Sequence, residues 1–413
     1  MELYLPIILD GATGTQLARK GYDGKVCAEK WTCEHPESVM WLHGAYAEAG
    51  SDIVYAPTFQ ANEPKLAETG LGGQTAEINK TLVGLSKKAT CGKSYVAGDI
   101  SPIGRFIEPF GDSSFDEIYD VYLEQIRAQE EAGVDLYAVE TQMTVPEARA
   151  AFLAARDTSD KPVLVSFTCN EKGKTLTGTD VTAALVIFQA MGAAAFGLNC
   201  SAGPDMVLEQ IKRLSEYNEV PLIAKPNAGL PEIVDGRTVY NCPPEEFASY
   251  AERFAACGVG LFGGCCGTTE EHIAALYEAT RNVEIKRPVL LLDRFQGQLV
   301  GATEKRVWML PEGTRCECWL DCSEDIEDAI DAAMEDEPVL IGIRISSEDE
   351  LESFGKVQGL IDAPLCIEAD DAVLLDRALR LYQGICMYRS SLDKAAAEKI
   401  ARRYGAISEE VRG

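Results

Sequence analysis

Residues 195–227 read AFGLNCSAGPDMVLEQIKRLSEYNEVPLIAKPN, and they contain a strand, a helix and a second strand in that order. The apolar runs at 195–200 and 221–227 are short and nearly uninterrupted, as in strands that are buried on both faces of a parallel sheet. Between them, apolar side chains recur every three to four residues over 204–217, which predicts an amphipathic helix. This stretch is therefore a parallel βαβ unit.

The same unit recurs from the start of the chain to about residue 285. Further strands are predicted at 6–10, 52–59, 95–100, 136–141, 162–169 and 259–264. Helices are predicted at 114–132, 179–190 and 268–282, the first and last with capping boxes, Ser114 with Glu117 and Thr268 with Glu271. Eight such strands in about 285 residues predict an α/β fold of the (β/α)8 TIM-barrel type. A doubly wound open sheet is the alternative, but no GxGxxG motif follows the first strand.

The regular alternation of strand and helix ends at about residue 285. We expect residues 286–413 to form a second, smaller α/β domain. Helical patterns lie at 323–336, 372–382 and 392–404, and strands are predicted at 339–345 and 364–368. The segment is too short for a second complete barrel, which needs at least about 200 residues. We expect it to pack against the barrel.

Composition limits the possible functions. The 413 residues are 46% hydrophobic and 25% charged, which is typical of a globular protein, and the net charge is −28. Such an acidic surface argues against nucleic-acid and anionic-membrane binding. The start lacks the features of a signal peptide, so we expect a cytoplasmic protein whose 14 cysteines are reduced thiols.

Three cysteines lie where strands of the predicted barrel end, and active sites of such barrels lie at that end. Cys200 ends the sixth strand, and Cys265 and Cys266 end the eighth. Adjacent side chains on a strand point to opposite faces, so these neighbours converge only if the flanking glycines of GGCCG let the backbone turn. Three thiolates with one open position are the layout of a catalytic zinc site. The alternative is that the three are buried thiols.

Six motifs resemble the homocysteine S-methyltransferase family, and cover about residues 1–285. They are ILDGATGTQL (8–17), VETQMTVPEA (139–148), SFTCNEKGKTLTGTD (166–180), GLNCSAGP (197–204), KPNAGLPE (225–232) and GGCCGTT (263–269). Within the family, the chain is most similar to the N-terminal homocysteine-binding barrel of cobalamin-dependent methionine synthase. The resemblance implies that Cys200, Cys265 and Cys266 bind Zn²⁺ and that the sulfur of homocysteine takes the open position.

The resemblance also implies contacts for the amino-acid end of homocysteine. Glu140 and Asp10 match the carboxylates placed near the ammonium group, and the N–H groups of Gly11 and Ala12 could bind the carboxylate. Asn199 and Asn227 flank the metal site, and our hypothesis is that the side-chain oxygen of Asn227 fills the fourth zinc position when substrate is absent.

Other candidates have simpler interpretations. Lys225 could form a Schiff base in an aldolase, but no phosphate-binding feature supports that chemistry. The three histidines, at 35, 43 and 272, lie away from the strand ends, and we interpret them as structural or surface residues. Cys316, Cys318 and Cys322 do not have a common metal-binding spacing, and we interpret that pattern as coincidence.

The methyl donor is expected to come from elsewhere. No DxHxxG cobalt-ligating loop is present, so methylcobalamin would arrive free or on a corrinoid protein in trans, beside a separate methyl-folate-binding protein. Residues 364–384 resemble part of the pterin-binding barrel of methionine synthase, which suggests a remnant used for docking. The prediction is a zinc-dependent S-methyltransferase that forms methionine. The alternatives are a small donor such as S-methylmethionine or betaine, or a non-catalytic thiol-binding assembly subunit.

Overall fold

The computed structural model describes residues 4–108, 111–234, 237–322, 325–335 and 338–409. Among these residues, no helix combines the length and the apolar character that crossing a bilayer would require.

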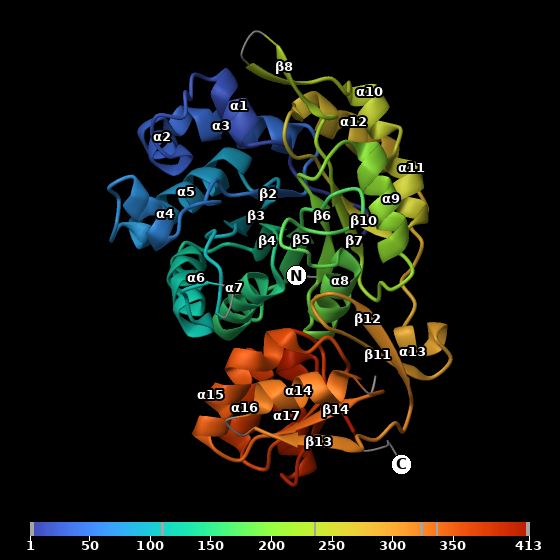
Figure 1. Cartoon of the computed structure of the whole chain (residues 1–413). Helices are drawn as coiled ribbons and strands as arrows, with labels where there is room; N and C mark the ends of the chain where they lie inside the picture. The colour runs from blue at the N-terminus through green and yellow to red at the C-terminus, as the bar shows by residue number, and fades with distance from the viewer. Residues whose placement is uncertain (1–3, 109–110, 235–236, 323–324, 336–337, 410–413) are drawn as a thin grey trace.

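Eight parallel strands form a ring in the N-terminal two thirds of the chain, which confirms the predicted barrel (Figure 1). Their order around the ring is β1-β10-β7-β6-β5-β4-β3-β2, and a bridge from Leu9 to Ile53 joins the two ends. The strands are β1 (Ile7–Ile8), β2 (Ile53–Tyr55), β3 (Tyr95–Ile100), β4 (Leu136–Gln142), β5 (Val163–Phe167), β6 (Ala195–Asn199), β7 (Leu222–Lys225) and β10 (Val259–Phe262). Most are one to four residues shorter than predicted, because the chain leaves the strand conformation where it enters the mouth of the barrel.

Helices surround this ring. The long ones are α3 (Pro36–Glu48), α5 (Thr75–Thr90), α6 (Phe115–Glu131), α7 (Val145–Thr158), α8 (Val181–Ala190), α9 (Pro204–Leu214) and α12 (Glu270–Thr280). Shorter ones are α1 (Gly14–Arg19), α2 (Ala28–Glu34), α4 (Glu63–Glu68), α10 (Pro244–Ala248) and α11 (Ala251–Ala256). The capping box of α6 forms as predicted. The box of α12 was predicted one residue too early, because it joins Thr269 and His272.

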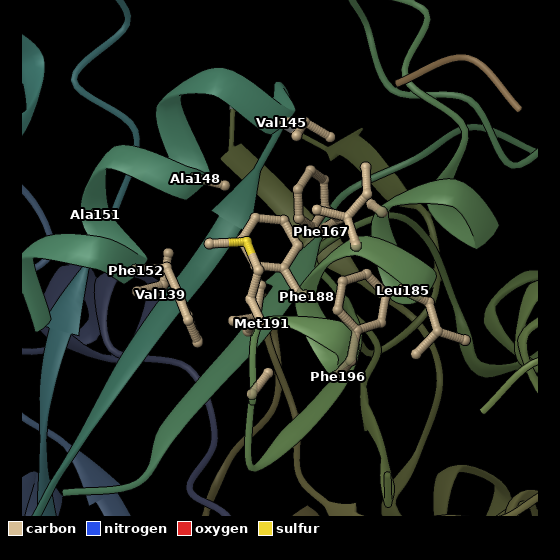
Figure 2. Close-up of a cluster of buried hydrophobic side chains, with 14 of the residues drawn as sticks. Val139, Val145, Ala148, Ala151, Phe152, Phe167, Leu185, Phe188, Met191 and Phe196 are labelled. Atoms are coloured by element: carbon tan, nitrogen blue, oxygen red, sulfur yellow. The ribbon is translucent and has the colours of Figure 1, made fainter. Parts of the chain in front are cut away.

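Two apolar layers hold the barrel together. Inside the ring, alternate strand residues such as Leu9, Ile53, Leu164 and Leu261 fill the interior. Outside it, strands β4 to β6 pack against α7 and α8, where Phe188 contacts Phe152, Phe167 and Phe196 (Figure 2). Because both faces of these strands are covered, their sequences are nearly continuous in apolar character.

A second parallel sheet of five strands follows, as the sequence predicted for an α/β unit. It contains β13 (Cys318–Asp321), β14 (Ile341–Arg344), β15 (Leu365–Glu368), β16 (Met387–Arg389) and β17 (Ile407–Ser408), in chain order. The helices between them are α14 (Ile326–Glu335), α15 (Glu348–Val357), α16 (Ala372–Leu381) and α17 (Lys394–Tyr404). Before this sheet come α13 (Leu291–Arg294) and an antiparallel hairpin of β11 (Gln298–Ala302) and β12 (Val307–Pro311).

This C-terminal part packs against α6, α7 and α8 of the barrel (Figure 1). Arg380 pairs with Asp116 of α6 at 2.9 Å. Arg149 of α7 is fully buried and donates to the carbonyl oxygen of Leu379 at 3.0 Å. The predicted domain boundary near residue 285 remains a prediction.

Candidate metal and substrate site

The three predicted cysteines meet at the mouth of the barrel. The sulfur atoms of Cys200, Cys265 and Cys266 all lie within 4.8 Å of one another, and those of Cys200 and Cys266 are 3.6 Å apart. Cys200 directly follows β6, and the other two follow β10, with β7 between these strands in the ring. Sequence positions 65 residues apart therefore converge because strands β6, β7 and β10 end at the same edge.

The backbone bends that the sequence led us to expect are present. Cys200 has a φ of +54° and Gly267 a φ of +82°, which is the left-handed region that favours glycine. A Cβ atom on Gly264 would lie 2.4 Å from the hydroxyl oxygen of Thr268. Hydrogen bonds then fix the loops to one another: Cys265 N donates to Pro226 O at 2.8 Å, and Ala228 N donates to Cys266 O at 2.9 Å.

The cluster fits a zinc ion. Tetrahedral zinc with Zn–S bonds of about 2.3 Å separates its sulfur ligands by about 3.8 Å, close to the spacing of Cys200 and Cys266. Hydrogen bonds from Cys200 and Cys265 lower the pKa of Cys266 to about 3, while the pKa values of Cys200 and Cys265 are raised, so the metal-free group holds a single thiolate, on Cys266. Three sulfurs leave one coordination position for a further ligand.

Asn227 contacts the backbone of Cys200 at the edge of the cysteine cluster. It lies just beyond β7, and its Nδ2 donates to the carbonyl oxygen of Cys200 at 3.5 Å. Its Oδ1 is buried and has no hydrogen-bond partner among the described residues. A carbonyl-type oxygen without a partner beside a metal site is suited to coordination, and its role as a ligand stays a prediction.

A cavity of about 330 Å³ opens beside the sulfur atoms. Its walls include seven predicted site residues, namely Asp10, Gly11, Ala12, Glu140, Cys200, Cys265 and Cys266. Asn199 and Asn227 are not in its walls. Residues that the sequence reasoning did not select as site residues also line it, among them Glu29, Tyr55, Phe59, Asp99 and Lys225.

Lys225 contributes an ammonium group to the wall of this cavity. Its Nζ lies 2.9 Å from Asp10 Oδ1 and 3.9 Å from Glu140 Oε2, and 3.6 Å from the centroid of the Tyr55 ring. Burial opposes its charge, but Asp10 and Glu140 outweigh that effect and raise the pKa of Lys225 well above its usual value. The protonated amine is not a nucleophile, which argues against the Schiff-base alternative.

Asp10 and its neighbours are tied into the protein. Asp10 Oδ2 accepts from the backbone N–H of Tyr55 at 2.7 Å, in addition to the ion pair with Lys225. The N–H of Ala12 already donates to Thr268 Oγ1 at 3.0 Å. For the N–H of Gly11, the described residues provide no acceptor. Of the two predicted carboxylate-binding groups, Gly11 is thus the one that is available.

Glu140 is held by Asn199. Asn199 Nδ2 donates to Glu140 Oε2 at 3.2 Å, and its Oδ1 accepts from Thr141 N and Ser166 Oγ, each at 2.9 Å. The amide of Asn199 is therefore hydrogen-bonded within the protein, and its predicted contact with the substrate stays a prediction. Burial, only partly offset by Lys225, raises the pKa of Glu140 to about 7.

The carboxyl ends of the C-terminal sheet carry residues of alternating charge. Arg344 pairs with Asp321 and Glu368, each at 3.2 Å. Arg389 pairs with Glu368 at 3.2 Å and with Glu409. Every strand end thus contributes one member of an ion-pair row. Among the described residues, the sulfur atoms of Cys316, Cys318 and Cys322 do not gather into a metal-binding group, and their interpretation as coincidence stays an interpretation.

The histidines have structural surroundings. His43 is fully buried, and burial lowers its pKa to about 4. His272 closes the capping box of α12 and contacts the carbonyl oxygen of Cys242 at 2.9 Å. His35 is exposed beside Glu37.

Comparison with known proteins agrees with this site. The homocysteine S-methyltransferase family matches residues 7–280. Methionine synthase from Mycobacterium tuberculosis (strain ATCC 25618 / H37Rv) is 31% identical over 299 residues, which are 68% of this chain and 25% of that protein. Methionine synthase from Mycobacterium leprae (strain TN) is 30% identical over 284 residues, 64% of this chain and 23% of that protein. The chain thus spans about a quarter of the length of these relatives.

A solved structure has the same fold. The metallated form of the homocysteine methyltransferase MmuM from Escherichia coli is 24% identical, with a TM-score of 0.56, and the match covers 67% of this chain and 96% of that one. The family match extends over most of the barrel and includes the strands that carry the three cysteines. The chain therefore belongs to the homocysteine S-methyltransferase family.

Proposed function

We propose that this protein is a zinc-dependent S-methyltransferase that converts homocysteine to methionine. The observation that carries the proposal is one cavity with three converging cysteine sulfurs at one place and the buried carboxylates of Asp10 and Glu140 in the same walls. Homocysteine has the matching groups, a thiol and an ammonium group on one short chain. Cys200, Cys265 and Cys266 would hold the zinc ion.

Bound zinc would deprotonate the substrate thiol and keep its sulfur nucleophilic, since three thiolate ligands leave the metal site electron-rich. The protein's own residues supply orientation. Glu140, held by Asn199, attracts the ammonium group, and the N–H of Gly11 is available for the carboxylate. Fixing both ends of the substrate turns the sulfur toward the open side of the cavity.

The methyl group is transferred by displacement. A sulfur lone pair forms the new carbon–sulfur bond while the bond between methyl and donor breaks, and its electron pair stays on the donor. We propose methylcobalamin as the donor, carried by a corrinoid protein or free, with a separate methyl-folate-binding protein to restore it. Cytoplasmic location is part of the same proposal.

The charged residues at the strand ends of the C-terminal sheet suggest its role. Paired charges occupy its strand ends, where a barrel would bind its ligand. We therefore propose that it serves in docking and does not bind a pterin.

The test mixes the zinc-loaded protein with homocysteine and methylcobalamin without oxygen, and follows the absorbance of the methyl–cobalt bond together with methionine. Zinc-dependent loss of that bond with equal formation of methionine is the expected result. A zinc-stripped sample and Cys265→Ser are the controls. Turnover with S-methylmethionine or betaine but not with methylcobalamin would replace the donor. Homocysteine binding without turnover on any donor would favour the assembly-subunit alternative.

A further inference from the structure

Asp99 is a buried carboxylate in the cavity wall that the proposed mechanism does not use. It lies at the carboxyl end of β3, and only 6% of its surface is exposed. Its Oδ1 is buried, and the described part of the chain offers it no hydrogen-bond partner. A buried polar atom without a partner is costly, which suggests that a ligand completes it.

The backbone around Asp99 is held firmly in place. Thr58 Oγ1 donates to Asp99 O at 2.9 Å and accepts from Asp99 N at 3.2 Å. Gln129 Nε2, from α6, donates to the same carbonyl oxygen at 3.2 Å. These buried contacts fix the strand end, so the carboxylate is presented to the cavity from a rigid support.

The carboxyl groups in the described walls of the cavity outnumber the cations. Asp10, Asp99 and Glu140 line it together with Lys225, and Lys225 makes its short ion pair with Asp10. Glu29 lines the same cavity, but one of its oxygens is taken by the backbone N–H of Gln60 at 2.8 Å. Burial raises the pKa of Asp99 well above its usual value, so the empty cavity keeps this carboxyl group neutral. A positively charged group on a ligand would let it ionise and would be bound by it.

We propose that Asp99, together with Glu140, binds the α-ammonium group of the thiol acceptor and makes the site selective for amino thiols over thiol carboxylates that lack the amine. This inference rests on the proposed function. Asp99 and Glu140 line the same cavity as the three cysteines, so one ligand can reach both carboxyl groups and the sulfur site. A thiol without the amine would bring its own carboxylate into this cavity but no positive charge to pair with Asp99 and Glu140, and would bind less tightly.

The experiment compares homocysteine with 4-mercaptobutanoate, which is homocysteine without its amino group. Dissociation constants are measured by calorimetry on the zinc-loaded full chain, for the wild type, Asp99→Asn and a control, Asp135→Asn. Asp135 is also an aspartate next to a barrel strand, but it precedes β4 at the opposite end, where its Oδ2 accepts from Val96 N at 2.8 Å.

The wild type is expected to bind homocysteine at least about 100-fold more tightly than 4-mercaptobutanoate. Asp99→Asn should weaken homocysteine binding about 10-fold to 100-fold, as expected for loss of a charged hydrogen bond, without weakening 4-mercaptobutanoate binding. In turnover, KM for homocysteine should rise while kcat stays near its original value. Asp135→Asn should preserve the preference.

Equal preference in Asp99→Asn and the wild type would overturn the role of Asp99 and leave the proposed function standing. Equal affinity of the wild type for both thiols would also overturn it. If the zinc-loaded wild type bound neither thiol, the proposed function itself would fail, and this inference with it. Circular dichroism and zinc content establish that each variant is folded, and Asp99→Ser provides a second neutral variant if Asp99→Asn is unstable.

Discussion

Replacing Lys225 with methionine removes an ammonium group from a cavity whose described walls hold several carboxylates and no other lysine. Lys225 is 3% exposed, and its Nζ is 2.9 Å from Asp10 and 3.9 Å from Glu140. With an effective dielectric constant of 20, these separations correspond to about 6 and about 4 kcal/mol of attraction. Part of this is offset because the ammonium group no longer has to be desolvated, so we expect a net destabilisation of about 3–5 kcal/mol.

The assay is thermal unfolding of the zinc-free protein at pH 8, followed by circular dichroism. For a barrel of this size, Lys225→Met should lower the midpoint by roughly 6–10 °C. The double variant Lys225→Met/Asp10→Asn should recover part of the loss, because it removes a buried carboxylate that would otherwise have lost its cation. Lys161→Met is the control, since its pair with Glu130 is partly exposed and should contribute at most about 1 kcal/mol.

The effect must also depend on pH. Without Lys225, the native-state pKa of Glu140 lies even further above its unfolded value, so the native state binds more protons than the unfolded state. The difference in unfolding midpoint between Lys225→Met and the wild type should therefore shrink as pH falls from 8 to 5.5. A midpoint for Lys225→Met equal to that of the wild type, or a deficit that grows at low pH, would refute this reasoning.

Three further predictions concern the site itself. Cys265→Ser should abolish stoichiometric zinc binding, measured by elemental analysis, whereas Ser in place of the exposed Cys91 should not. Gly264→Ala should weaken zinc at least tenfold in a chelator competition, because the new Cβ would lie 2.4 Å from Thr268 Oγ1; Gly14→Ala, which meets no atom within 4 Å, should not. Homocysteine affinity should rise with pH, because zinc displaces the thiol proton and because Glu140 ionises near pH 7, and calorimetry on Glu140→Gln should show weaker binding with a shallower rise. Zinc retained in Cys265→Ser would contradict the first prediction, and unchanged zinc affinity in Gly264→Ala would contradict the second. A pH dependence of homocysteine affinity in Glu140→Gln equal to that of the wild type would contradict the third.

The barrel could be predicted because its strands are buried on both faces. Each then appears in the sequence as a short apolar run, and the runs at 95–100 and 195–200 match β3 and β6 to within one residue. The hairpin of β8 (Pro231–Val234) and β9 (Arg237–Tyr240) was not predicted, because its exposed residues have no apolar alternation toward a core. The short strands β16 and β17 were missed for want of length, since two or three residues do not establish a period.

The cysteine cluster could be predicted because strand ends and the glycine-flanked pair are visible in the sequence. The residues that pair with the protein's substrate-binding carboxylates could not be predicted. The ion pair of Lys225 with Asp10 joins residues 215 positions apart, and no local pattern indicates it. Asn199 flanks the metal site in the sequence, but no local pattern indicates that its side chain hydrogen-bonds Glu140 and Ser166. Asp99 lies near one of eight predicted strand ends. Only the structure distinguishes it, because its Oδ1 has no hydrogen-bond partner among the described residues.

The central claim is that three cysteine sulfurs hold zinc and leave one position for the sulfur of homocysteine. Zinc K-edge X-ray absorption on the loaded protein, before and after adding homocysteine, tests it most directly. The account predicts three sulfur ligands and one lighter atom before addition, and four sulfur ligands afterwards, with the change lost when 4-mercaptobutanoate is used at the same concentration. An unchanged first shell of three sulfurs under saturating homocysteine would contradict it.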